Sequence, residues 1–100
     1  MEYCLKFHDA QNRWAVITDT KEGLIGHDYT FKPMKAHIVK AAYDEADFHY
    51  FRKAKEPIPV GTEVMIDTWW MNFYGSYFKI MWQGHKYDVK TDCVLIDKED

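Results

Sequence analysis

The fold is decided by residues 57–96, which read PIPVGTEVMIDTWWMNFYGSYFKIMWQGHKYDVKTDCVLI. Apolar and polar residues alternate in short runs, and turn-forming residues separate the runs, a pattern typical of strands joined by tight turns. Expected strands span residues 64–70, 77–82, 86–90 and 94–96. Because side chains alternate across a strand, every second residue of each run is expected inside. The predicted core residues are Val64, Ile66, Trp70, Phe78, Ile80, Trp82, Tyr87 and Val89.

Two more strands are expected near the start of the chain. Residues 3–7 alternate between apolar and polar positions, and residues 14–18 are rich in β-branched and aromatic side chains, so together they predict a hairpin. Residues 19–33 contain Gly23 and Gly26 and show no sustained period, which favours a long loop.

Residues 34–55 allow two interpretations. Their Ala, Lys and Glu content and the spacing of Val39, Tyr43 and Ala46 favour a helix. In such a helix, Phe48 and Phe51 would spread the aromatic side chains beyond one buried stripe. We therefore expect a hairpin of strands 36–43 and 48–54 around a polar turn at residues 44–47, and keep the helix as the alternative.

The segment 75–90, GSYFKIMWQGHKYDVK, resembles the last half of small Src-homology-3-like barrels of the bacterial kind. Those domains commonly read aromatic, Lys, Val or Ile, a residue or two, Gly, Lys, aromatic, Val. The resemblance covers residues 57–96. It implies a five-stranded or similar barrel and, for many members, binding of peptides or proteins through aromatic residues near the loops.

The expected fold is mainly β: a small Src-homology-3-like barrel with an additional N-terminal β-hairpin layer. One hundred residues suffice for a single domain with one core. We expect residues 57–96 to form the barrel-like half and residues 1–56 to pack on it. The alternative is an α+β fold with a helix within residues 34–55.

Charge and composition make several function classes unfavourable. The chain has 13 basic and 16 acidic residues, a net charge of −3, which attracts a phosphate backbone weakly. No apolar run approaches the ~20 residues of a membrane span and no secretion signal is recognisable, so a cytoplasmic protein is expected, with Cys4 and Cys93 reduced. The five histidines lack metal-ligand spacing, so we expect no metal, no cofactor and no enzymatic activity.

The aromatic residues left outside the predicted core are the candidate site. If Trp70 is buried, its neighbour Trp69 must point to the outer face, unless the N-terminal half covers it. Exposed aromatic side chains that gather together are typical of contact surfaces. The sequence therefore predicts a non-enzymatic module that binds a protein or peptide, and a small phage or mobile-element inhibitor of a host factor is a variant of this hypothesis. The predicted partner-binding residues are Trp69, Phe73, Tyr74 and Tyr77.

Two alternatives remain open. Residues 48–55 combine aromatic with basic side chains, which would suit stacking on single-stranded nucleic acid with phosphate contacts; these residues are Phe48, Tyr50, Phe51, Arg52, Lys53 and Lys55. A small-ligand pocket between the two β layers is the other alternative, and it would require a deep cleft lined by His27, His85 or Asp67.

Overall fold

The protein is mainly β, as expected from the sequence. The structure, a computed structural model, describes residues 3–7, 9–11, 14–18 and 25–97, with the ranges 3–7 and 14–18 described by their backbone alone. The elements are β1 (Tyr3–Phe7), β2 (Trp14–Thr18), β3 (Tyr29–Ile38), α1 (Glu45–His49), β4 (Glu63–Asn72), β5 (Gly75–Trp82), β6 (His85–Lys90), the 3₁₀ turn η1 (Thr91–Cys93) and β7 (Val94–Ile96).

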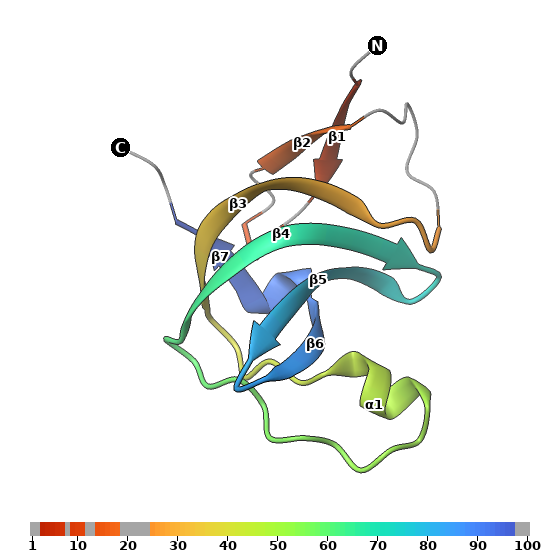
Figure 1. The fold of residues 1–100 in the computed structure, drawn as a ribbon, viewed down its shortest axis with the longest axis vertical. Helices are drawn as coiled ribbons and strands as arrows, with labels where there is room; N and C mark the ends of the chain where they lie inside the picture. The colour runs from red at the N-terminus through yellow and green to blue at the C-terminus, as the bar shows by residue number, and fades with distance from the viewer. Residues whose placement is uncertain (1–2, 8, 12–13, 19–24, 98–100) are drawn as a thin grey trace.

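The strands form two antiparallel sheets. β1 pairs with β2, which confirms the N-terminal hairpin, and β2 contacts β3. The larger sheet has the order β6-β5-β4-β3-β7 and curls strongly, so that β5 and β6 turn across the curved pair β3 and β4 (Figure 1). β7 returns beside β3 after η1. The result is a half-barrel in which the last strand, β7, lies next to β3, the earliest strand of this sheet in the chain.

The first part of β3 was not expected, because residues 19–33 were predicted to be a loop, whereas its last residues fall within the predicted strand 36–43. Residues 19–24 lie outside the described part, but β3 begins at Tyr29 and runs through Pro33 to Ile38. Burial is the reason, since Tyr29, Ala36 and Ile38 are all at most 1% exposed in the core. The sheet therefore extends beyond residues 57–96 and takes a central strand from the first half of the chain.

The predicted hairpin of residues 36–43 and 48–54 is wrong, and the alternative helix is much shorter than the segment that suggested it. α1 has only five residues, and Asp44 caps it by accepting a hydrogen bond from the Ala46 N–H (3.2 Å). The helix ends at His49 with Tyr50 as its C-cap, and Phe51 then adopts a left-handed backbone with φ of 56°. Such a φ is rare for a bulky residue and stops the helix.

The tryptophan pair is oriented opposite to the prediction. Trp69 is 4% exposed in the core, whereas Trp70 is only half-buried. Ile66 and Trp69, three residues apart, both face inward, so the strict alternation of the strand breaks between them. The register of β3 against β4 shifts in the same region, between Thr30 and Met34. A bulge of this kind bends a strand and changes which residues face the core.

The rest of the predicted core agrees with the structure, apart from Trp82, which is half-buried. The two-residue turn between β5 and β6 is also confirmed. Gln83 and Gly84 have φ of 48° and 78°, the left-handed values that let a two-residue turn match the twist of its strands. The buried apolar residues are Tyr29, Ala36, Ile38, Ala42, Ile58, Val64, Ile66, Trp69, Tyr77, Phe78, Ile80, Tyr87, Val89, Val94 and Ile96.

Both outer strands of the larger sheet are closed by a buried aspartate. On β7, the Ile96 N–H donates to Asp9 Oδ2 (3.0 Å), and the Ala10 N–H donates to the Val94 carbonyl (2.7 Å). On β6, the Asp88 N–H donates to Asp44 Oδ1 (3.0 Å). Sheet edges expose unpaired backbone groups that can pair with another chain. These contacts satisfy one such group on β6 and two on β7.

Candidate functional site

A groove of about 560 Å³ separates α1 from the turn between β4 and β5. The two walls approach each other where the His49 and Tyr74 rings lie 6.3 Å apart between centroids. Aromatic and apolar side chains dominate the groove, and a few charged groups close one side of it. It is lined by Glu45, Ala46, Phe48, His49, Tyr50, Trp70, Asn72, Phe73, Tyr74, Tyr77, Asp88 and Lys90.

The floor of the groove is a rigid aromatic pair. Trp70 and Tyr77 are opposite residues of β4 and β5, and their rings stack 4.8 Å apart at 27°. The Trp70 indole N–H donates to Asp88 Oδ1 on β6 (3.3 Å). Cross-strand aromatic pairs stabilise a sheet, and this hydrogen bond fixes the indole plane.

The rim consists of exposed aromatic side chains from both walls. Phe73 is 87% exposed and Tyr74 is 77% exposed at the tip of the β4–β5 turn. Asn72 Oδ1 holds this turn by accepting hydrogen bonds from the N–H groups of Tyr74 (2.8 Å) and Gly75 (3.1 Å). Phe48 and Tyr50 on the α1 side are also more than half exposed. Such rings offer contact area at little cost in side-chain entropy.

A buried charge cluster holds α1 and the chain that follows it against the sheet. Lys55 Nζ lies 2.7 Å from Asp44 Oδ2 and 3.0 Å from both carboxylate oxygens of Asp47. The Lys55 N–H donates to Asp47 Oδ2 (3.0 Å), and Arg52 Nε lies 3.2 Å from Asp47 Oδ1. The two aspartate side chains are only 4% and 3% exposed. The predicted polar turn at 44–47 is thus an anchor inside the protein.

The cluster shifts the pKa values of its members in opposite directions. The backbone hydrogen bond from Lys55, with the charges of Lys55 and Arg52, outweighs burial and lowers the pKa of Asp47. The hydrogen bond to Asp44, with that to Asp47, outweighs burial and raises the pKa of Lys55. Both shifts favour the charged forms of Asp47 and Lys55.

The four predicted partner-binding residues divide into two pairs. Phe73 and Tyr74 are exposed on the rim, whereas Trp69 and Tyr77 are each 4% exposed, so the expectation that they lie on the surface is wrong. Trp69 packs in the core against Tyr29, with ring centroids 5.4 Å apart. Tyr77 contributes to the floor of the groove beneath Trp70. The predicted exposure of these aromatic residues is therefore confirmed only in the β4–β5 turn, at Phe73 and Tyr74.

Sequence reasoning missed the contribution of α1 to this site. Phe48 and Tyr50 were grouped with the basic residues 52–55 as a platform for nucleic acid. In the structure Arg52 pairs with Asp47 and lies 5.4 Å from the Tyr50 ring centroid, and Lys55 points into the protein. Two of the three cations that were expected to contact phosphates, Arg52 and Lys55, are thus already bound by carboxylates. The spacing of the aromatic residues around the short helix was the sequence signal that could have identified this wall of the groove.

The cysteines show no sign of an activated nucleophile within the described residues. Burial and the neighbouring Asp92 raise the pKa of the Cys93 thiol to about 11, so the thiol is protonated at neutral pH. The side chain of Cys4 lies outside the described residues, and β1 pairs with β2 while β7 pairs with β3. Among the residues that the structure describes, no three His, Cys, Asp or Glu side chains gather as a metal site would require.

Comparison with known proteins places no relative beside this chain. No protein-family model matches it, and the searches of curated proteins and of solved structures gave no match. In the described part of the chain, the one helix, α1, is far too short to cross a membrane. The groove is therefore interpreted from its own chemistry.

Proposed function

We propose that this chain is a non-enzymatic module that binds a protein or peptide in the groove between α1 and the β4–β5 turn. The observation that carries the proposal is the convergence of aromatic side chains from two distant segments. Phe48 and Tyr50 come from α1 and its end, and Phe73 and Tyr74 come from the β4–β5 turn. Aromatic rings that serve only the core would be buried. Exposed aromatic clusters of this kind typically provide much of the binding energy at protein interfaces.

Pre-organisation supports the same function. The stacked floor, the Asn72 turn and the buried charge cluster each fix one part of the groove before a partner arrives. A rigid site loses less conformational entropy on binding, so more of the contact energy appears as affinity. The Glu45 and Lys90 side chains, 3.5 Å apart, add a polar edge that would orient a partner.

The barrel family and the cellular context belong to the same proposal. The sheet order, with β7 returning beside β3, supports a small Src-homology-3-like barrel. A cytoplasmic location and an origin as a phage or mobile-element inhibitor remain predictions from the sequence.

The test is affinity capture from cell extract with a matched pair of variants. We expect the double variant Phe73→Ser and Tyr74→Ser to lose the captured partner, because both rings are exposed and their removal leaves the fold intact. The control is Val60→Ser, which removes an apolar side chain that is 63% exposed and does not line the groove. Retention of the same partner by the double variant would refute the proposed site.

Salt dependence separates a protein partner from nucleic acid. An aromatic interface predicts an affinity that changes little with ionic strength, whereas phosphate contacts predict a steep fall. Titration of the captured partner between 50 and 200 mM salt, a range over which several phosphate contacts cost roughly a thousandfold in affinity, distinguishes the two.

A further inference from the structure

The strands β4 and β5 part in the middle of the larger sheet. Their pairing runs from Asn72 opposite Gly75 to Trp69 opposite Phe78. Beyond that point β4 continues along β3 and β5 continues along β6, and within the described residues no pairing joins residues 63–68 to residues 79–82. The sheet thus contains an internal opening between two strand edges.

The hydrogen-bond pattern shows which backbone groups face this opening. The Ile38 N–H donates to the Thr62 carbonyl (3.0 Å), and Ala36 lies opposite Val64 in the same antiparallel ladder. In such a ladder alternate residues turn their N–H and C=O groups to opposite sides. Val64 therefore bonds towards β3, and the backbone groups of Glu63 and Met65 point towards β5.

The same argument applies to β5. Trp82 lies opposite His85 and closes the two-residue turn to β6, so the groups of Trp82 and Ile80 bond to β6. Those of Lys79 and Met81 point towards β4. Two rows of donors and acceptors therefore line the opening without a partner strand between them.

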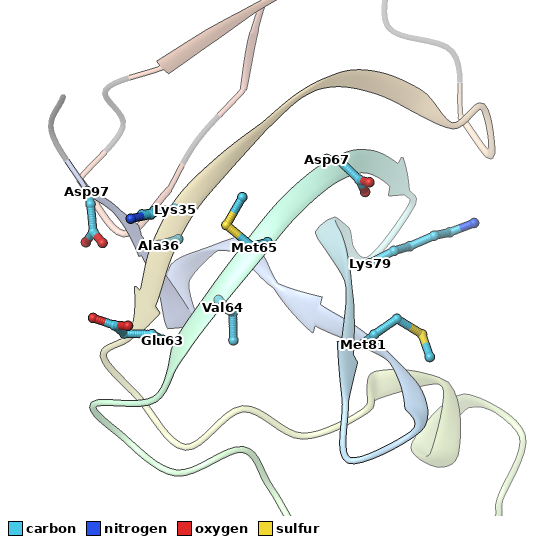
Figure 2. Close-up of a pocket in the computed structure, with 9 residues that line it drawn as sticks. All are labelled: Lys35, Ala36, Glu63, Val64, Met65, Asp67, Lys79, Met81 and Asp97. Carbon is cyan, nitrogen blue, oxygen red and sulfur yellow. The ribbon is translucent and has the colours of Figure 1, made fainter.

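Figure 2 shows a shallow pocket of about 510 Å³ over this opening. Met65 on β4 and Met81 on β5 are 52% and 67% exposed and lie on opposite sides of it. Methionine side chains adapt to partners of different shape. Glu63 and Asp67 lie at the two ends of the same stretch of β4 and are exposed.

Three carboxylates, Glu63, Asp67 and Asp97, and two ammonium groups, Lys35 and Lys79, line the opening, so its net charge is negative and favours a basic partner. Lys79 is engaged by Asp28, with Nζ and Oδ2 2.6 Å apart, so it is not available to an acidic ligand. Neither Glu63 nor Asp67 has a cation partner among the described residues. An extended chain lying along β4 would place alternate side chains opposite these two carboxylates and Met65.

We propose that the edge of β4 at residues 63–67 accepts an extended segment of a partner protein as an added strand. The segment carries two basic side chains opposite Glu63 and Asp67 and an apolar one between them opposite Met65. Backbone hydrogen bonds supply the affinity and the alternate side chains supply the specificity, as in other cases of strand addition. At the outer edges of the larger sheet, by comparison, Asp9 and Asp44 each already accept a backbone hydrogen bond, from Ile96 and Asp88. The site and the aromatic groove share no lining residue.

The probe is the peptide acetyl-Lys-Val-Leu-Val-Lys-amide, titrated into the intact protein and followed by amide hydrogen exchange. We expect binding to slow exchange of the Met65 N–H, which faces the opening. N-methylation of the central leucine removes a backbone donor aimed at β4 and should weaken binding by at least about tenfold. An unchanged Met65 exchange rate, or equal binding of the methylated peptide, would overturn the proposal.

Two further comparisons test the charge and the edge. The peptide acetyl-Glu-Val-Leu-Val-Glu-amide should bind at least about tenfold more weakly, because its carboxylates meet Glu63 and Asp67. The variant Met65→Pro removes an N–H that the fold does not use, a position where a strand tolerates proline, and should abolish peptide binding while circular dichroism stays unchanged. Equal binding of the acidic peptide would contradict the assigned partner chemistry. The methylated peptide requires no variant, so the proposal stays testable even where Met65→Pro unfolds.

Discussion

Replacing Lys55 with methionine should destabilise the protein strongly, although methionine keeps most of the side chain. The ammonium group holds Asp44 Oδ2 at 2.7 Å and both oxygens of Asp47 at 3.0 Å. Its loss leaves two carboxylates that are almost completely buried, and only Asp47 keeps a cation, Arg52. Breaking a buried ion pair by removing one partner costs about 3–5 kcal/mol.

We expect the lower end of that range, because Lys55 itself is 29% exposed and water can reach part of the cluster. A loss of about 3 kcal/mol in the free energy of unfolding corresponds to a fall of about 15 °C in the melting temperature of a domain this size. That is a large share of the 5–15 kcal/mol that usually separates folded from unfolded states.

Urea unfolding followed by tryptophan fluorescence measures the effect. Lys53→Met is the matched control, since it makes the same change two residues away at an exposed position and should alter stability by at most about 0.5 kcal/mol. Adding Asp44→Asn to Lys55→Met should recover part of the lost stability, because the asparagine amide is neutral and leaves no unpaired charge buried at this position. If Lys55→Met and Lys53→Met unfold at the same urea concentration, the cluster does not anchor α1.

Three other predictions follow from the same structure. Trp69→Ala should cost about 3–5 kcal/mol in urea unfolding and Phe73→Ala less than about 0.5, the reverse of what an exposed Trp69 would give. Because the pKa of Asp47 is lowered, the stability that it contributes is present above its unfolded pKa and is lost as pH falls below about 4. Because the pKa of Lys55 is raised, the stability that it contributes is lost only as pH rises above about 10.4. Thermal unfolding measured across pH should therefore show a melting temperature that falls below about pH 4 and again above about pH 10.4. Gln83→Asn should raise the melting temperature by a few degrees, about 0.5 kcal/mol, because asparagine tolerates the left-handed φ of this turn better; an unchanged melt would show that the turn is not strained.

Alternation along the chain was sufficient to predict β4 to β7, because each of these strands packs one face against the core. It also predicted the N-terminal hairpin, whose backbone pairing the structure shows. It failed at Trp69, where the bend of β4 depends on how β3 lies beside it. β3 was hidden for a related reason. Its inward residues include Tyr29 and Ala36, but the irregular register across Pro33 removes the period of two that a sequence pattern requires.

The groove was predictable only in part. The exposure of Phe73 and Tyr74 in the turn could be predicted, because the chain has more aromatic residues than one small core can bury. The position of the second wall, α1, depends on the contact between Lys55 and Asp44, eleven residues earlier, and no local sequence pattern predicts such a contact. The sequence signal at residues 44–47 was polar and was therefore interpreted as a solvated turn.

The two aspartates at the outer strands have a consequence for how many strands the sheet can contain. A β-sheet has no intrinsic width, and each exposed edge is a template for growth. Here Asp9 occupies the donor of Ile96 and Asp44 occupies the donor of Asp88. Each aspartate thus withdraws one backbone donor from an outer strand, and replacing both by alanine would return these donors to edges at which a further strand could pair.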